Sequence, residues 1–300
     1  MSFTSIVKNE ASKALSNEKE NIAELSAIIS NGKISNNRVS IVIENASVAR
    51  RIFNLFKDLF GVSIDITARN SLGKQKKYLY ILEMDINNDI STKLCINDKN
   101  LFIDNDDTIR AYLRGVFLMT GSINDPKTSR YHLEFVVDNK KYAEFVSKLL
   151  NIYHLNSKVL KRENKYMVYV KEAERIGDFL RIIKASNAIL YFEDIRIYRD
   201  HKNMTNRLNN CEQANIDRII ETSNEQIKDI ELIMEAGLDL LNEKEQIVAT
   251  YRLKYRDASL SELSEIITHE TGKDITKSGL YHRFKKIKVL ADRMRNIDID

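Results

Sequence analysis

The chain has 300 residues, which exceeds one typical domain and suits two. Hydrophobic residues make up 43% of it, enough for a full core, yet no apolar run approaches the roughly 18 to 20 residues that a membrane helix needs. We therefore expect a soluble, cytoplasmic protein without a membrane partner. The net charge of +4 by itself indicates no particular ligand.

The N-terminal third predicts an α+β unit in the order helix, strand, helix, strand, strand, because apolar residues recur at helical spacing in two segments and alternate in others. The expected helices span 7–30 and 48–60, and the expected strands span 39–43, 62–67 and 78–84, the last after a turn at 73–76. The second third repeats this order, with helices over 108–119, 140–153 and 172–184 and strands over 131–137, 157–160 and 166–170. A repeated order implies a pseudo-twofold domain over residues 1–190.

A polar, basic bridge follows this domain. Together with the start of a linker helix near Ile216, it spans residues 191–222, and it carries the basic residues Arg196 and Arg207. Within it, an amide-rich cluster surrounds Cys211 and consists of Asn206, Arg207, Asn209, Asn210 and Asn215. Such side chains either grip a DNA backbone or base edge, or cap and tether the helix that joins the domains. The sequence favours the second interpretation and leaves the first open.

The last segment, residues 223–300, predicts an all-α bundle of three helices. Two capping boxes open its first two helices, and either Thr276 or Ser278 can cap the third. The boxes pair Asn242 with Glu245 and Ser259 with Glu262. In the third helix, Leu280, Phe284 and Ile287 recur at a spacing of four and three residues, so they should face the core.

The opposite face of the third helix is cationic, because residues 277–295 include seven basic residues and a single acid. A basic, capped helix behind a short second helix is the pattern of a helix-turn-helix, whose recognition helix enters the major groove of double-stranded DNA. We expect contacts to base edges or the nearby backbone from Lys277, Ser278, Tyr281 and His282. Phosphate contacts should come from Arg283, Lys285, Lys286 and Lys288, with Arg196 and Arg207 as a weaker basic run. A helix that docks on another protein is the alternative.

The stretch from Leu113 to Gly121 indicates very close helix packing. Gly115 and Gly121 each cost roughly 1 kcal/mol relative to alanine if they are interior to a helix, and a tight approach of two helices can compensate. A shorter copy lies at 25–32, whose Ala27 and Gly32 should face the partner helix. Residue for residue, the stretch 113–121 resembles the LAGLIDADG motif of homing endonucleases, and the upstream copy matches with one residue missing.

In that family the acid before the last glycine of each copy holds the catalytic magnesium, and the resemblance places Thr120 and Asn31 at those positions. Magnesium needs hard anionic oxygens, and neither a hydroxyl nor an amide replaces a carboxylate in charge. Asp125 lies close by, but the residues around it predict a turn that points elsewhere. We therefore expect a fold kept for its shape and surface, without catalytic residues, metal ligands or cofactors.

A degenerate LAGLIDADG-like domain followed by a helix-turn-helix resembles the WhiA family of bacterial DNA-binding regulators over nearly the whole chain. The resemblance is carried by residues 112–122, 193–196, 206–215, 257–263 and 277–283. It implies a transcription or chromosome-associated factor, linked to sporulation in some bacteria and to cell division or chromosome segregation in others. The chain departs from the family pattern in the shortened first motif and in a lengthened turn before Lys277.

These observations predict a sequence-specific, nucleoid-associated DNA-binding regulator that is not an enzyme. The sheet face of the first domain would add Arg69, Lys74, Lys76, Lys77, Lys158, Lys161, Arg162 and Lys165 to the DNA contact. Two alternatives stay open: an active magnesium-dependent homing-type endonuclease, and an interaction module that docks on RNA polymerase, another regulator or the division machinery. The two cysteines stand far apart and the five histidines show no ligand-like pairing, so neither a disulfide nor a zinc site is expected.

Overall fold

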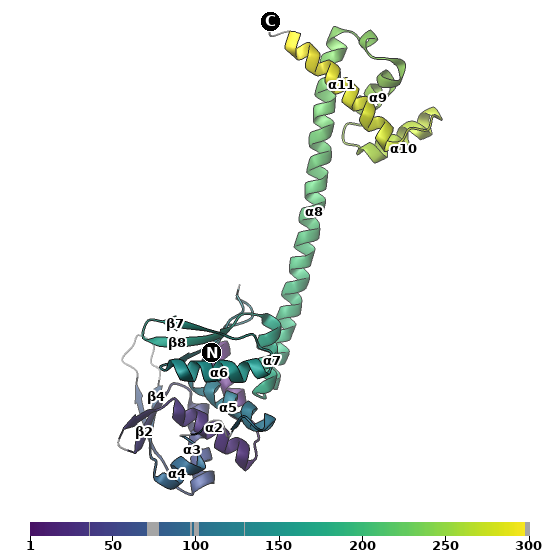
Figure 1. Ribbon diagram of the computed structural model, residues 1–300. Coiled ribbons are helices and arrows are strands. Elements are labelled where there is room, and N and C mark those ends of the chain that lie inside the picture. Colours follow the sequence, from purple (N-terminus) through teal and green to yellow (C-terminus); the bar gives the residue numbers. More distant parts are fainter. Residues whose placement is uncertain (36, 71–77, 97, 99–101, 129, 298–300) are drawn as a thin grey trace. The chain divides into compact units, whose positions relative to one another are not determined.

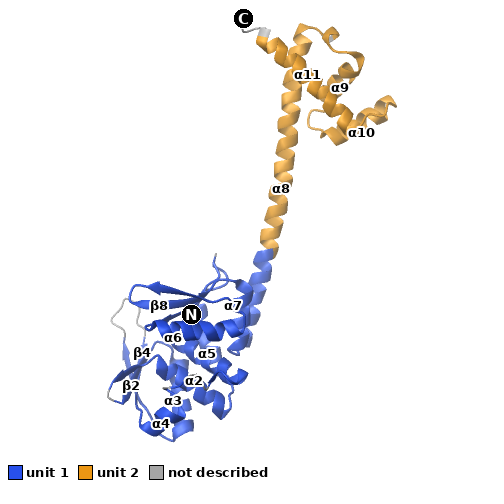
Figure 2. Ribbon diagram, viewed as in Figure 1, with its two compact units in different colours: residues 1–200 blue, residues 201–300 orange. Residues whose placement is uncertain are grey.

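The computed structural model describes residues 1–300 apart from 36, 71–77, 97, 99–101, 129 and 298–300. It divides into two compact units, residues 1–200 and residues 201–300 (Figure 2). Unit 1 combines helices with two sheets, whereas unit 2 is helical in its described part (Figure 1). The division falls inside the predicted bridge, and the turn predicted at 73–76 lies outside the described residues. Among those residues, none of the helices combines the length and apolarity that a bilayer crossing requires.

Unit 1 contains two halves that share one order of elements, apart from an additional helix at the start of the first half. The first half contains α1 (Phe3–Ala11), α2 (Glu18–Ser30), β1 (Lys33–Ser35), β2 (Arg38–Ile43), α3 (Ala46–Phe60), β3 (Asp65–Asn70), β4 (Tyr78–Asp85) and α4 (Asn88–Lys93). The second half contains α5 (Asp106–Thr120), β5 (Gly121–Ile123), β6 (Leu133–Val137), α6 (Lys140–Ile152), β7 (Lys158–Arg162), β8 (Lys165–Val170) and α7 (Ala173–Ile182). The antiparallel sheets have the orders β1-β2-β4-β3 and β5-β6-β8-β7. This equivalence confirms the predicted pseudo-twofold α+β fold.

The single helix predicted over 7–30 is wrong, because the chain divides it into α1 and α2. Ser12 ends α1, and Asn17 caps α2 by accepting a hydrogen bond from the Glu20 amide at 2.9 Å. A short polar side chain that satisfies the free amides of a first turn favours a new helix start. The break allows α1 to pack on α5 and on β5, where the Thr4 hydroxyl donates to the Ile123 carbonyl at 2.8 Å.

The two motif helices, α2 and α5, pack side by side in unit 1 (Figure 1). A Cβ added to Gly115 would lie 2.4 Å from the Glu24 carbonyl oxygen and 2.9 Å from the Ala27 Cβ. The predicted close approach is therefore confirmed for Gly115 and Ala27. It is wrong for Gly32 and Gly121, because both glycines lie past the ends of their helices. Gly121 has an extended conformation and is the first residue of β5.

Unit 2 encloses a core of its own. The helices α9 (Glu243–Lys254), α10 (Leu260–Thr271) and α11 (Lys277–Ile297) pack around buried apolar side chains that include Val248, Leu263, Leu280 and Ile287. A short 3-10 helix, η2 (Leu238–Leu240), precedes α9. Both predicted capping boxes are present, at the starts of α9 and α10. The predicted all-α helix-turn-helix unit is thus confirmed.

A single helix, α8 (Ser186–Ala236), carries the chain from unit 1 into unit 2. The helix that the sequence placed near Ile216 therefore begins 30 residues earlier, at Ser186. The C-terminal part of α8 contributes Ile230 and Ile233 to the unit 2 core. Between residues 201 and 218, by contrast, every side chain of α8 is exposed.

Candidate nucleic-acid interface

The two positions that the motif resemblance equates with metal-holding acids carry Asn31 and Thr120, whose side chains form hydrogen bonds within unit 1. Asn31 caps α2, and its amide donates to the Ala27 carbonyl at 2.8 Å and to the Tyr142 hydroxyl at 2.9 Å. Thr120 ends α5, and its hydroxyl donates to the Val116 carbonyl at 3.0 Å. Burial raises the pKa of Tyr142 well above its ordinary value, so this hydroxyl supplies no anionic oxygen either.

The carboxylate of nearby Asp125 also has hydrogen-bond partners of its own. It accepts hydrogen bonds from the Lys127 amide at 2.9 Å and from the Tyr191 hydroxyl at 3.4 Å, while its carbonyl accepts from the Thr128 amide at 2.9 Å. These contacts form the predicted turn and direct the side chain toward α8. Within the described part of the chain, no group of three or more His, Cys, Asp or Glu side chains is arranged to hold a metal ion.

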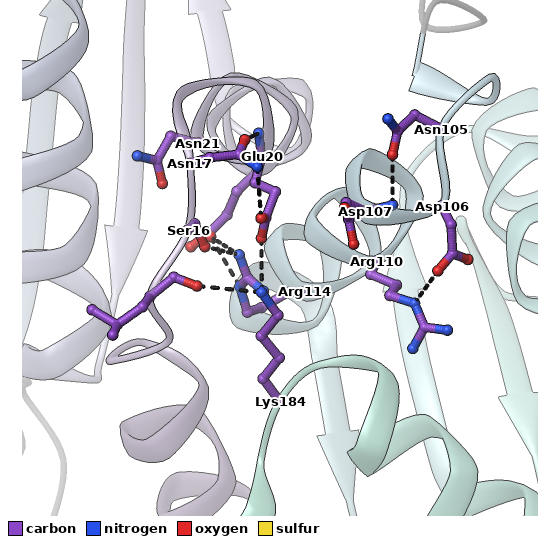
Figure 3. Close-up of polar contacts among 12 residues, drawn as sticks. Ser16, Asn17, Glu20, Asn21, Asn105, Asp106, Asp107, Arg110, Arg114 and Lys184 are labelled. Carbon is purple, nitrogen blue, oxygen red and sulfur yellow. Dashed lines mark hydrogen bonds and ion pairs between the residues drawn. The ribbon is translucent and has the colours of Figure 1, made fainter.

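A buried charged cluster that sequence reasoning missed lies where the motif helices meet. Glu24 on α2 accepts hydrogen bonds from Arg114 on α5 at 2.7 and 2.9 Å, and from Arg51 on α3 at 2.9 and 3.0 Å. Glu24 and Arg114 are fully buried, and Arg114 also donates to the Ser16 hydroxyl at 2.7 Å (Figure 3). The sequence signal for this cluster was Arg114 among the apolar residues of α5. A charged side chain is almost never buried unless it is paired, so a buried carboxylate partner could have been expected. The cluster joins α2, α3 and α5, which is a structural role.

The cations predicted on the sheet face of unit 1 are divided between two faces. Strand pairing places Lys158 and Arg162 opposite Tyr169 and Lys165, so three of the cations share one face of the second sheet. Lys161 falls on the opposite face, in the same row as core-facing residues. The predicted contacts Lys74, Lys76 and Lys77 lie outside the described residues.

The outer face of the first sheet carries charges of both signs. Arg38 on β2 forms ion pairs with Asp65 on β3 at 3.3 Å and with Glu83 on β4 at 3.1 Å. Register places Arg69 in the same row of β3 as Asp65. Two carboxylates in this position weaken the attraction of the first sheet for a polyanion.

The α11 helix separates apolar from polar side chains as predicted. Leu280, Phe284 and Ile287 are buried in the unit 2 core. The residues proposed as DNA contacts on α11 lie on the surface: Lys277, Ser278, Tyr281, His282, Lys285, Lys286 and Lys288 are exposed and Arg283 is half-buried. The rings of Tyr281 and His282 lie edge to face at the start of the helix, with centroids 5.9 Å apart.

Only some of these cations are free of intramolecular partners. Lys288 forms an ion pair with Glu225 on α8 at 3.2 Å, and this carboxylate raises the pKa of Lys288. Lys277, Lys285 and Lys286, in contrast, form no ion pair with any residue that the structure describes. The latter three are therefore available to an external anion without breaking a contact.

The connection between α10 and α11 spans residues 272–276 and is held by side chains of α10. Gly272 ends α10 in the left-handed conformation at φ 68°, which glycine adopts without steric cost. The Ile275 amide then donates to the Thr268 hydroxyl at 3.2 Å. Thr276 caps α11, because its hydroxyl accepts from the Gly279 amide at 3.1 Å. Side-chain hydrogen bonds therefore hold the lengthened turn in a defined conformation.

The bridge cations differ from each other in their surroundings. Arg196 is half-buried and forms an ion pair with Glu193 at 2.7 Å, whereas Arg207 is exposed on α8. The favoured interpretation of the amide-rich cluster as helix caps is wrong. Its asparagines lie in the interior of α8, where they have no helix end to cap.

Sequence profiles of known families match three parts of the chain. Residues 18–96 match the WhiA N-terminal LAGLIDADG-like domain, residues 109–202 the WhiA LAGLIDADG-like domain, and residues 205–291 the WhiA C-terminal HTH domain. The chain is 40% identical over 311 aligned positions to the probable cell division protein WhiA of Staphylococcus aureus (strain JH9), covering 99% of this chain and 98% of that protein.

Solved structures agree with these sequence matches. The crystal structure of full-length DUF199/WhiA from Thermatoga maritima is similar with a TM-score of 0.61 and 26% identity, covering 98% of this chain and 99% of that one. The N-terminal LAGLIDADG domain of DUF199/WhiA shares the fold of unit 1, with a TM-score of 0.53, 22% identity, and coverage of 60% of this chain and 89% of that one. Because sequence and fold agree over both units, this chain belongs to the WhiA family.

Proposed function

We propose that the chain is a sequence-specific DNA-binding regulator without catalytic activity. One observation carries the proposal: α11 buries one side in the unit 2 core and exposes Lys277, Lys285 and Lys286 on the other, where no described residue pairs with them. Cations held unpaired on a rigid helix attract a phosphate backbone, because binding releases its condensed counterions. The match of residues 205–291 to a helix-turn-helix domain supports the same function.

The two ends of α11 would contribute differently. Lys277, Ser278, Tyr281 and His282 occupy its first turns and would meet base edges, since a recognition helix leads into the groove with its N-terminus. Lys285, Lys286 and Arg283 follow and would meet phosphates, which position the protein without reading sequence. Lys288 and Arg196 would contribute less than expected, because each already has a carboxylate partner.

The cellular process is also part of the proposal. The Staphylococcus aureus relative is named a probable cell division protein, which supports a role for this chain in cell division or chromosome segregation. The regulator would then act on the nucleoid in the cytoplasm, through transcription. Genome-wide occupancy of the intact protein, beside a Lys285→Gln/Lys286→Gln variant, tests this. We expect the intact protein to occupy discrete sites on the genome and the variant to lose them.

The affinity for duplex DNA as a function of salt tests the proposed α11 contact directly. Replacing Lys285 and Lys286 by glutamine removes two phosphate contacts, so the slope of log affinity against log salt should decrease by about 2. Fluorescence anisotropy with labelled duplexes from the source genome measures this slope. Lys244→Gln is the matched control, because it removes an exposed lysine from α9 in the same unit. An affinity that does not respond to salt would contradict the proposal.

The absence of catalysis has its own test. With Asn31 and Thr120 in place of the acids, we expect supercoiled plasmid and genomic duplexes to stay intact during prolonged incubation with magnesium. Gel electrophoresis of the incubated DNA shows the outcome. Magnesium-dependent nicking that disappears in a Thr120→Val variant would instead establish the endonuclease alternative.

A further inference from the structure

One side of α8 in unit 2 presents a row of one lysine and several amide side chains that the proposed α11 contact does not use. Lys202, Asn206, Asn209 and Gln213 follow one another at steps of four, three and four residues, so they lie along one side of the helix. Asn203 and Asn210 lie next to this row, both on the same side of it. We refer to these six residues as the amide face.

The amide face is solvent-exposed and almost free of internal contacts. All six side chains are exposed, and the one hydrogen bond that the structure gives them joins the Gln213 amide to Asp217 at 2.8 Å. The stretch 202–213 that contains the face holds Lys202 and Arg207 against the single acid Glu212. The face therefore combines the charge of Lys202 with a dense set of hydrogen-bond donors and acceptors.

Helix stability does not account for this composition. Asparagine is a poor residue for a helix interior and costs roughly 0.5 to 0.7 kcal/mol relative to alanine at each position. In this part of α8 no buried side chain compensates that cost, because every residue from 201 to 218 is exposed. Asn203, Asn206, Asn209 and Asn210 thus weaken the element that contains them. Recognition of an external partner gives a physical reason for their presence.

We propose that the amide face of α8 is a second DNA-binding surface, in addition to α11. An asparagine amide offers a donor and an acceptor side by side, which match the major-groove edge of adenine and also bond to phosphate oxygens. The groove is wide enough for an α-helix, and Lys202 would neutralise a phosphate beside it. The inference rests on the proposed function, because it adds a contact to the same duplex.

The opposite side of the same helix has a different chemistry. Met204, Leu208 and Cys211 lie there, and they offer no comparable set of hydrogen-bonding groups. That side provides a matched control, since it is equally exposed and belongs to the same turns of α8. A DNA contact through the amide face requires the two sides to respond differently to substitution.

The experiment compares full-length variants by fluorescence anisotropy on duplexes bound by the wild-type protein. Asn206→Ala/Asn209→Ala/Asn210→Ala should lower the affinity at least about tenfold while leaving the salt slope unchanged, because the amides are neutral. Lys202→Gln should lower the slope by about 1. Met204→Gln/Leu208→Gln should bind as the wild type does. Circular dichroism should show no loss of helix in the alanine variant, because alanine is the better helix former.

The outcomes separate this inference from the proposed function. If Lys285→Gln/Lys286→Gln loses affinity but the alanine variant binds as the wild type does, the amide face is not a DNA contact and the proposed function stands. If the alanine and Met204→Gln/Leu208→Gln variants lose affinity equally, the effect comes from the helix itself and the inference is wrong. If the wild-type protein binds no duplex, both proposals fail.

Discussion

At the scale of single residues, Gly115 determines how closely the two motif helices approach. An alanine there would place its Cβ 2.4 Å from the Glu24 carbonyl oxygen, a backbone atom that cannot move without shifting α2. We expect Gly115→Ala to lower the free energy of unfolding of unit 1 by about 1 to 3 kcal/mol, as overpacking does. Urea denaturation followed by circular dichroism measures the change.

The matched control for this substitution is Gly279 on α11. The nearest atom to an added Cβ there is the Thr276 hydroxyl oxygen at 3.4 Å, which is an ordinary contact. Gly279→Ala should therefore leave unit 2 as stable as before or stabilise it, since alanine favours the helix. Equal destabilisation by both substitutions would show that glycine content, and not the approach of α2 and α5, sets the effect.

Lys8 on α1 gives unit 1 a dependence on pH. Its ammonium lies 5.8 Å from the centroid of the Phe117 ring, and burial lowers its pKa from 10.5 to about 8, although Glu44 opposes the shift. Between these two values the unfolded chain binds more protons than the folded one, so stability should rise with pH. Below pH 8 the full cost of burying the charge is present. Urea unfolding of the wild type and of Lys8→Met, measured from pH 8 to 10.5, checks this rise in stability. If the free energy of unfolding changes with pH in the same way for both proteins, Lys8 is not the cause.

At the scale of elements, the start of α11 depends on one hydroxyl. Thr276 accepts a hydrogen bond from the Gly279 amide at 3.1 Å, whereas Ser278 is exposed within the first turn. Thr276→Ala should destabilise unit 2 by about 0.5 to 2 kcal/mol, the range for a lost N-cap, and Ser278→Ala should change its stability little. Chemical denaturation of the two variants distinguishes them. The reverse order would assign the cap to Ser278.

At the scale of the whole molecule, two separate hydrophobic cores predict two unfolding transitions. Leu113 is fully buried in the core of unit 1 and Ile267 in that of unit 2. Leu113→Ala should lower the free energy of unfolding of unit 1 by about 2 to 5 kcal/mol, and Ile267→Ala should do the same for unit 2. Each substitution should shift the transition of its own unit to lower temperature and leave the other transition unchanged. Differential scanning calorimetry resolves the two. A single transition that shifts with either substitution would show that the units unfold together.

The sequence by itself determined the repeated α+β order, the capping boxes of α9 and α10, and the two faces of α11. These features follow from local periodicity and from side chains that bond to nearby amides, as Ser259 does with Glu262 at the start of α10. The lack of a carboxylate at the two motif positions was also visible, because Thr120 and Asn31 stand there. Each of these signals is carried by residues that lie close together in the sequence.

Only the tertiary structure decided which charged and polar groups have partners. Arg114 and Glu24 are separated by 90 residues, and Lys288 and Glu225 by 63, so no local pattern links them. The amide-rich cluster shows the same limit, because its sequence favoured a helix cap, whereas its asparagines lie in the interior of α8. Pairing and exposure depend on which elements pack together, which is set by the burial of distant apolar side chains.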